Sequence, residues 1–177
     1  MAARTLDVGD LIGAVAGTLF VVLNAGLLGA AGHLLVSVLA VAAAVTIVVA
    51  WARGRRGTGS AGGFPMTRSY RVIVTIEVLA LVVGVAVLGR TAPQLTVPWV
   101  VLVVGAHFLA FVRWWPVAGR VFAGLGTAMV VLAVAGGVVG IVGGLDAQPV
   151  AAFVAGFGSG LVMLVPTTIG AVRSLRA

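Results

Sequence analysis

The sequence contains no cysteine and no lysine, and charged residues fill only 8% of its 177 positions. The missing cysteine excludes disulfides and thiolate metal sites, and the missing lysine excludes a Schiff-base mechanism. A soluble domain carries roughly a quarter charged residues, so this chain has too few to cover a water-facing surface. With 62% hydrophobic residues and a mean hydropathy of +1.26, the chain is expected to lie in a lipid bilayer.

Six apolar runs are each long enough for a membrane-crossing helix, which takes about 20 residues. Glycine, proline or polar residues separate them, as is typical of turns. The sequence therefore predicts an all-α integral membrane bundle of six transmembrane helices, which forms a single domain over residues 1–177. The predicted spans are residues 9–31, 33–52, 70–89, 97–115, 118–144 and 148–171, with a flexible basic loop at 53–69.

The arginines give the orientation of these spans. Six spans place ten arginines on one side of the membrane and only Arg90 on the other. Because basic residues accumulate on the cytoplasmic side, both termini are predicted to be cytoplasmic, with a bacterial cytoplasmic membrane as the expected location. The net charge of +7 is thus a topology signal, and no nucleic-acid partner is expected.

The predicted cytoplasmic loop contains two features. Its arginines are expected to contact anionic lipid headgroups; these are Arg53, Arg55, Arg56, Arg68 and Arg71. The loop also contains Gly57-x-Gly59-x-x-Gly62, which has the spacing of a dinucleotide-binding fingerprint. No strand precedes this motif and no helix starts within it, so we interpret it as a solvated linker.

Small residues recur at the spacing that allows helices to approach closely in lipid. We expect these glycines to pack helices within the monomer; the alternative is a face for a second copy or a partner subunit. The ridge in the fifth span is predicted to pack most closely against the sixth span. The predicted packing residues are Gly13, Gly17, Gly136, Gly140, Gly144, Gly156 and Gly160.

Glu77 is the only carboxylate deep inside a predicted span, since Asp10 lies at the interfacial end of the first span. A carboxylate at that depth is unfavourable unless it is paired, protonated or exposed to water. Glu77 lies six residues beyond Arg71, and His107 lies six residues before Arg113 on the next span, so both sit about 9 Å from the inner interface. The sequence predicts that they pair, either as a proton-coupling site or as a structural hydrogen bond between the two spans.

Other intramembrane polar residues are weaker candidates. Asn24 is expected to hydrogen-bond to a neighbouring helix, with substrate contact as the alternative. Pro166 is expected to kink the last span, and with Thr167 and Thr168 it either lines a cavity or simply curves the helix.

The segment Gly105-Ala106-His107-Phe108-Leu109, preceded by a glutamate in the adjacent span, resembles a motif of small bacterial polytopic membrane proteins. The similarity covers the third and fourth spans, about a quarter of the chain. In that group a proline often follows the leucine, whereas this chain has Ala110. The resemblance implies a multi-span membrane protein and no particular activity.

Three classes of function remain open. The first is a small solute or proton-coupled transporter, or a membrane-embedded permease subunit, with Glu77, His107 and Asn24 as candidate site residues. The second is a structural or regulatory membrane partner. A membrane enzyme that uses Glu77 is a third, less favoured class, because no nucleophile elbow, zinc-binding helix motif or phosphate-binding loop occurs. No catalytic residue, metal site or cofactor is predicted.

Overall fold

The computed structural model describes residue 6 and residues 8–58, 67–113 and 119–176. Within these ranges every regular element is helical and no strand occurs. Helices are the expected solution for such apolar segments, because each helix satisfies its own backbone hydrogen bonds. The all-α class predicted from the sequence is therefore confirmed.

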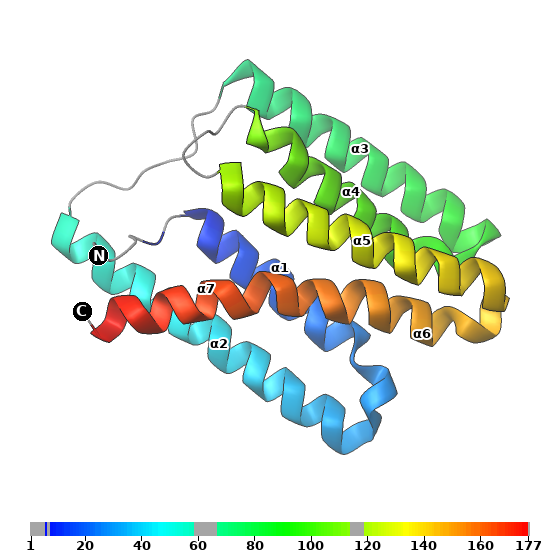
Figure 1. Ribbon diagram of the computed structural model, residues 1–177, viewed down its shortest axis with the longest axis horizontal. Helices are drawn as coiled ribbons and strands as arrows, with labels where there is room; N and C mark the ends of the chain where they lie inside the picture. Colours follow the sequence, from blue (N-terminus) through cyan, green and yellow to red (C-terminus); the bar gives the residue numbers. More distant parts are fainter. Residues whose placement is uncertain (1–5, 7, 59–66, 114–118, 177) are drawn as a thin grey trace. The chain divides into compact units, whose positions relative to one another are not determined.

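The chain divides into two compact units, which are described separately. Unit 1 comprises Met1–Phe64 and Gly160–Ala177, and unit 2 comprises Pro65–Ser159. In Figure 1 the helices are coloured by their position in the chain, from blue at the N-terminus to red at the C-terminus. The last helix, α7 (Gly158–Arg176), begins at the end of unit 2 and belongs to unit 1 from Gly160 onward.

Unit 1 begins with α1 (Val8–Asn24), the short 3-10 turn η1 (Gly26–Leu28) and α2 (Gly29–Thr58). A break was predicted at residues 29–33, and the observed turn meets it at Gly29, but the predicted end of the first span at residue 31 is several residues too late. Gly29 has a φ of 68°, a conformation that glycine adopts without the strain of a side chain, and this reverses the chain direction. Apolar residues continue on both sides of the turn, so composition gave no sharper end for the first span.

α2 is also longer than predicted. It remains helical through Thr58, so residues 53–58 are not part of a loop as expected. At 1.5 Å per residue its 30 residues span about 45 Å, longer than a hydrocarbon core of about 30 Å. The rest of the predicted loop up to residue 66, with Gly59 and Gly62 of the glycine motif, lies outside the described residues.

Unit 2 begins with α3 (Arg68–Thr91), η2 (Pro93–Leu95), α4 (Thr96–Val112) and α5 (Gly119–Gly143). These three α-helices lie side by side in chain order (Figure 1). The unit ends with η3 (Gly144–Ala147), α6 (Gln148–Ala152) and the π-helical turn η4 (Phe153–Phe157). The predicted fourth span extended to residue 115, and its last two residues lie outside the described part of the chain.

Four helical segments are long and apolar enough to cross a membrane, which suggests a membrane protein. They are Gly26–Gly54, Arg68–Thr91, Pro93–Val112 and Gly119–Arg176, and a shorter apolar helix covers Gly9–Asn24. Many large apolar side chains on these helices are exposed, as on α3, where Ile76 is 61% and Val82 63% exposed. Such a surface suits lipid and would be unfavourable in water.

The glycines confirm close packing at some predicted positions and correct others. In unit 1, a side chain at Gly160 would lie 2.8 Å from the Gly17 carbonyl oxygen, so α1 and α7 cross at these glycines. In unit 2, a side chain at Gly136 would lie 2.7 Å from the Ala151 carbonyl oxygen on α6. Gly156 is buried.

Three predicted packing glycines have other environments. Gly140 faces the carbonyl oxygen of Gln94 in η2, not the sixth span as predicted, because α5 turns this face toward the connection between α3 and α4. Gly144 has a φ of 62° and starts the turn η3, so it is not part of a helix ridge. Among the described residues, no atom beyond the nearby helix backbone lies within 4 Å of a Cβ atom placed on Gly13.

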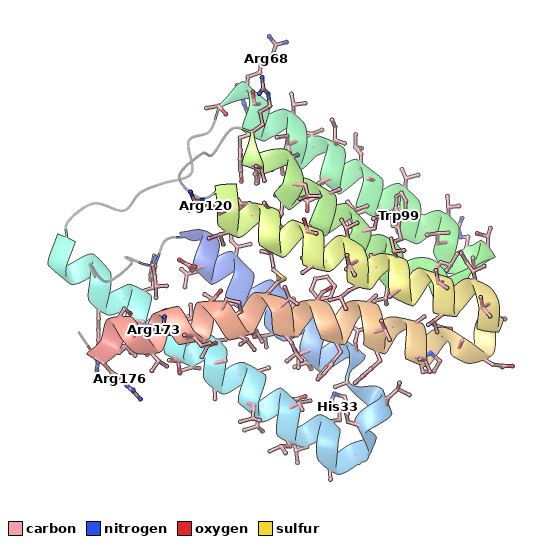
Figure 2. All side chains as sticks on the ribbon, in the orientation of Figure 1. His33, Arg68, Trp99, Arg120, Arg173 and Arg176 are labelled. Carbon is pink, nitrogen blue, oxygen red and sulfur yellow. The ribbon has the colours of Figure 1, made fainter. Side chains whose placement is uncertain are left out.

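A tryptophan connects α3 to α4 in unit 2. The Nε1 group of Trp99 on α4 donates a hydrogen bond to the Ala80 carbonyl oxygen on α3, with a length of 3.0 Å. The indole ring occupies the space that a side chain would need at Gly84, one turn farther along α3. Figure 2 labels Trp99 on α4. The missing side chain of Gly84 therefore lets the ring lie directly on the α3 backbone.

Candidate functional site

The predicted pair of ionisable residues is present in unit 2. His107 on α4 places its Nδ1 atom 2.8 Å from the Oε2 atom of Glu77 on α3. The estimate of equal depth from the sequence was correct, and the rotation of each helix, which the sequence left open, turns both side chains into the same interface. The contact itself is confirmed; a role in proton coupling remains a prediction.

The two side chains of the pair are mostly but not fully buried. The His107 side chain is 13% exposed and the Glu77 side chain 17% exposed. Although the two atoms are at hydrogen-bond distance, Nδ1 makes no hydrogen bond of acceptable angle, so the contact is bent. A small rotation of either side chain would align the two groups for a hydrogen bond.

Aromatic rings surround the histidine on the side toward the start of α3. The His107 ring lies edge-on to Phe111, with centroids 4.2 Å apart. Phe111 stacks in turn on Tyr70 from the start of α3, at 5.8 Å. Phe122 from α5 lies 5.9 Å from Phe108 and 6.0 Å from Phe111. These rings restrict the orientation of the imidazole and reduce the access of water to it.

This aromatic cluster was not predicted, although the sequence contains a signal for it. Tyr70, Glu77 and Gly84 are spaced seven residues apart on α3, so they lie on one helix face after every second turn. Each of them meets α4: Tyr70 stacks on Phe111, Glu77 contacts His107, and Gly84 receives Trp99. These three residues therefore mark the contact between α3 and α4.

Asn24 does not make the predicted interhelical hydrogen bond. Its Nδ2 group donates to the Phe20 carbonyl oxygen of its own helix at 2.9 Å. A ring nitrogen of His33, at the start of α2, lies 2.8 Å from the Val22 carbonyl oxygen (His33 is labelled in Figure 2). Both side chains therefore contact carbonyl oxygens near the end of α1, where the last carbonyls of a helix lack helical partners.

Pro166 lies inside α7, and the helix continues beyond it to Arg176, five residues past the predicted end. The hydroxyls of Thr167 and Thr168 donate to the Met163 and Leu164 carbonyl oxygens of the same helix, at 2.9 and 2.7 Å. These hydroxyls are thus used within α7, one turn back along the helix. Both threonines belong to unit 1, whereas Glu77 and His107 belong to unit 2.

The predicted lipid-contacting arginines fall on two helices. Arg53, Arg55 and Arg56 lie in the last turns of α2, and Arg68 and Arg71 lie in the first turn of α3. Arg53, Arg68 and Arg71 are exposed. Comparisons of the chain with protein-family models, with curated proteins and with solved structures find no match. The contact between Glu77 and His107 is therefore the main indication of function.

Proposed function

We propose that the chain crosses the membrane six times with both termini in the cytoplasm. The segment Gly119–Arg176 supports two of these crossings, because the positive φ of Gly144 and the contact of Gly136 with Ala151 bring the helix after the turn back along α5. α1, α2, α3 and α4 supply the other four. The ten-to-one distribution of arginines then agrees with the positive-inside rule.

Cysteine labelling tests this topology without removal of native cysteines, since the chain has none. Thr67 directly precedes α3 and Thr91 is its last residue, and both are exposed. In inverted and right-side-out vesicles, an impermeant maleimide should label Thr67→Cys only from the cytoplasmic side and Thr91→Cys only from the opposite side. Detergent should make both positions reactive. Labelling of both from one side would contradict the six-crossing topology.

We propose that the protein is a small proton-coupled transporter or a membrane-embedded permease subunit. The observation that carries this proposal is the contact between Glu77 and His107 within an otherwise apolar helix pair. Ionisable groups at this depth are unfavourable in lipid and typically mark ion or proton pathways. Both side chains are partly exposed, so the surrounding protein does not enclose the pair.

The mechanism requires only these two side chains. With one proton shared by the pair, the carboxylate accepts from the imidazole and neither group is an isolated buried charge. A second proton leaves a neutral carboxyl beside an imidazolium, and this weakens the attraction that holds α3 to α4. Proton binding can therefore favour a different packing of these two helices, which is how protonation would be coupled to solute movement.

The alternative is a structural or regulatory partner subunit in which the pair only locks α3 to α4. The packing of His107 against Phe111 favours this alternative, because a ring held at 4.2 Å by another ring has limited freedom to move. Under this alternative the protein would co-purify with another membrane subunit or with a second copy of itself, and it would move no solute alone.

Proton flux in proteoliposomes separates these alternatives. Vesicles that enclose a pH-sensitive dye should respond to at least one member of a panel of amino acids, monocarboxylates and amines when they contain the unmodified protein. Glu77→Gln should abolish this response, because the amide cannot bind a proton, while keeping the helical circular dichroism spectrum. A solute-dependent pH change that persists in Glu77→Gln would show that the pair is structural.

A further inference from the structure

A shallow hollow lies on the outward face of α3, near its first turn. Five described residues line it, and its volume is about 440 Å³. They follow the spacing of one helix face, at positions i, i+3, i+4, i+7 and i+8. The lining residues are Arg68, Arg71, Val72, Thr75 and Ile76.

The lining changes from charged to apolar along the helix. Arg68 and Arg71 are exposed at the start of α3, and the side chain of Arg68 extends away from the helix in Figure 2. Val72 and Ile76 are 49% and 61% exposed, and Leu79 and Val83 continue the same apolar face at 58% each. Thr75 supplies a hydroxyl within the apolar zone, one turn beyond Arg71. From Arg68 to Ile76 the helix rises about 12 Å.

This order matches a phospholipid aligned with the helix. Two guanidinium groups suit a phosphate, because arginine donates paired N–H groups to its oxygens. A threonine hydroxyl one turn deeper suits the ester oxygens, and the apolar face suits an acyl chain. Among the described residues no carboxylate lines the hollow, and the nearest one along the chain, Glu77, contacts His107 on a different face of α3.

We propose that the hollow binds one anionic phospholipid, with Arg68 and Arg71 on its phosphate and Val72 and Ile76 against an acyl chain. This goes beyond a general attraction of basic residues to the membrane surface, because it assigns a defined lipid to one helix face. Of the five arginines predicted to contact lipid, the structure assigns two to this site. The proposal is independent of any transport by the protein.

The chain offers a matched control for this site. Arg173 and Arg176 on α7 are also exposed and also three residues apart, and Figure 2 labels both. They lie in the last turn of their helix, where the helix dipole disfavours an anion, whereas Arg68 and Arg71 lie in a first turn, where it favours one. Substitution of either pair removes the same charge from the same chain.

Native mass spectrometry of the detergent-solubilised protein, titrated with phosphatidylglycerol or phosphatidylcholine, tests the proposal. The unmodified protein should bind one phosphatidylglycerol in preference to phosphatidylcholine. Arg68→Gln/Arg71→Gln should weaken this binding at least about fivefold, since each arginine near an anionic membrane contributes about a factor of five. Arg173→Gln/Arg176→Gln should leave it within about twofold, and glycerol 3-phosphate, which lacks acyl chains, should not displace the lipid.

Several results would overturn the proposal. Equal weakening by the two double variants would show a general charge effect without a site. Equal binding of phosphatidylcholine would show that the arginines do not select the headgroup. Displacement by glycerol 3-phosphate would identify a site for a free phosphate ester instead of a lipid. Circular dichroism and gel filtration of Arg68→Gln/Arg71→Gln should match the unmodified protein, and Arg68→Lys/Arg71→Lys, which keeps the charge, provides a second variant if they do not.

Discussion

Gly136→Ala should destabilise the protein by about 1–3 kcal/mol, the usual penalty for inserting a methyl group into a packed interface. The added carbon would lie 2.7 Å from the Ala151 carbonyl oxygen and 2.9 Å from the Ala155 Cβ atom. One of these atoms belongs to the backbone, so α5 and the α6–η4 segment must separate and lose close contact along the crossing. Thermal unfolding in detergent, followed by circular dichroism, measures the loss.

The adjacent glycine provides the control. A side chain at Gly137 would have its nearest neighbour, the Pro98 Cβ atom, at 4.0 Å. Gly137→Ala should therefore be neutral or slightly stabilising, because alanine favours the helix more than glycine does. If the two variants unfold at the same temperature, the close approach at Gly136 is not what holds these segments together.

His107→Leu should destabilise the protein more than Glu77→Gln does. Removal of the imidazole leaves the sheltered carboxyl without its partner, and an unsatisfied buried polar group costs about 1–3 kcal/mol. An amide at position 77 can still accept a hydrogen bond from His107 and carries no charge, so Glu77→Gln should cost below about 1 kcal/mol. Urea- or heat-induced unfolding of the two variants in the same detergent measures the difference.

A double variant completes this comparison. His107→Leu/Glu77→Leu removes both polar groups, so it should be more stable than His107→Leu alone if the stranded carboxyl causes the damage. The changes in unfolding free energy caused by His107→Leu and by Glu77→Leu, each measured alone, are compared with that of the double variant. If the two single changes add up to the double change, the residues do not interact energetically, and the 2.8 Å contact contributes nothing to the packing of α3 on α4.

The sequence predicted the parts of the structure that depend on composition and depth. Charge scarcity and long apolar runs predicted helices, and counting residues from Arg71 and Arg113 placed Glu77 level with His107. Such arithmetic uses only the rise per residue of a helix, which varies little. Proline and polar residues also placed the later helix ends well, since they interrupt helices for stereochemical reasons.

Other features depend on which way each helix faces, and the sequence did not give this. Gly140 was assigned to the wrong neighbour because apolar residues surround it on every side of α5, so no amphipathic pattern fixes the rotation. Asn24 was expected to bond across helices, but its side chain donates to the Phe20 carbonyl oxygen of its own helix. The turn at Gly29 required knowledge of a backbone conformation that any of several nearby glycines could adopt.

The π-helical turn η4 was not predicted at all. It lies between α6 and α7, in a stretch rich in glycine and alanine, where the rings of Phe153 and Phe157 stack with centroids 4.6 Å apart. Residues four apart already face each other on an ordinary α-helix, so their spacing alone does not reveal the extra residue in the turn.

The proposed function requires that Glu77 and His107 share and exchange a proton as one unit. Infrared difference spectra recorded between acidic and neutral buffer detect protonation of both groups. The chain has only four acidic side chains and two histidines, so spectra of Glu77→Gln and His107→Gln assign the bands. We expect carboxyl and imidazole bands that change together, and that vanish together in either variant, because the two side chains are in contact. Carboxyl bands of Glu77 that stay constant across this range, or that persist unchanged in His107→Gln, would contradict it.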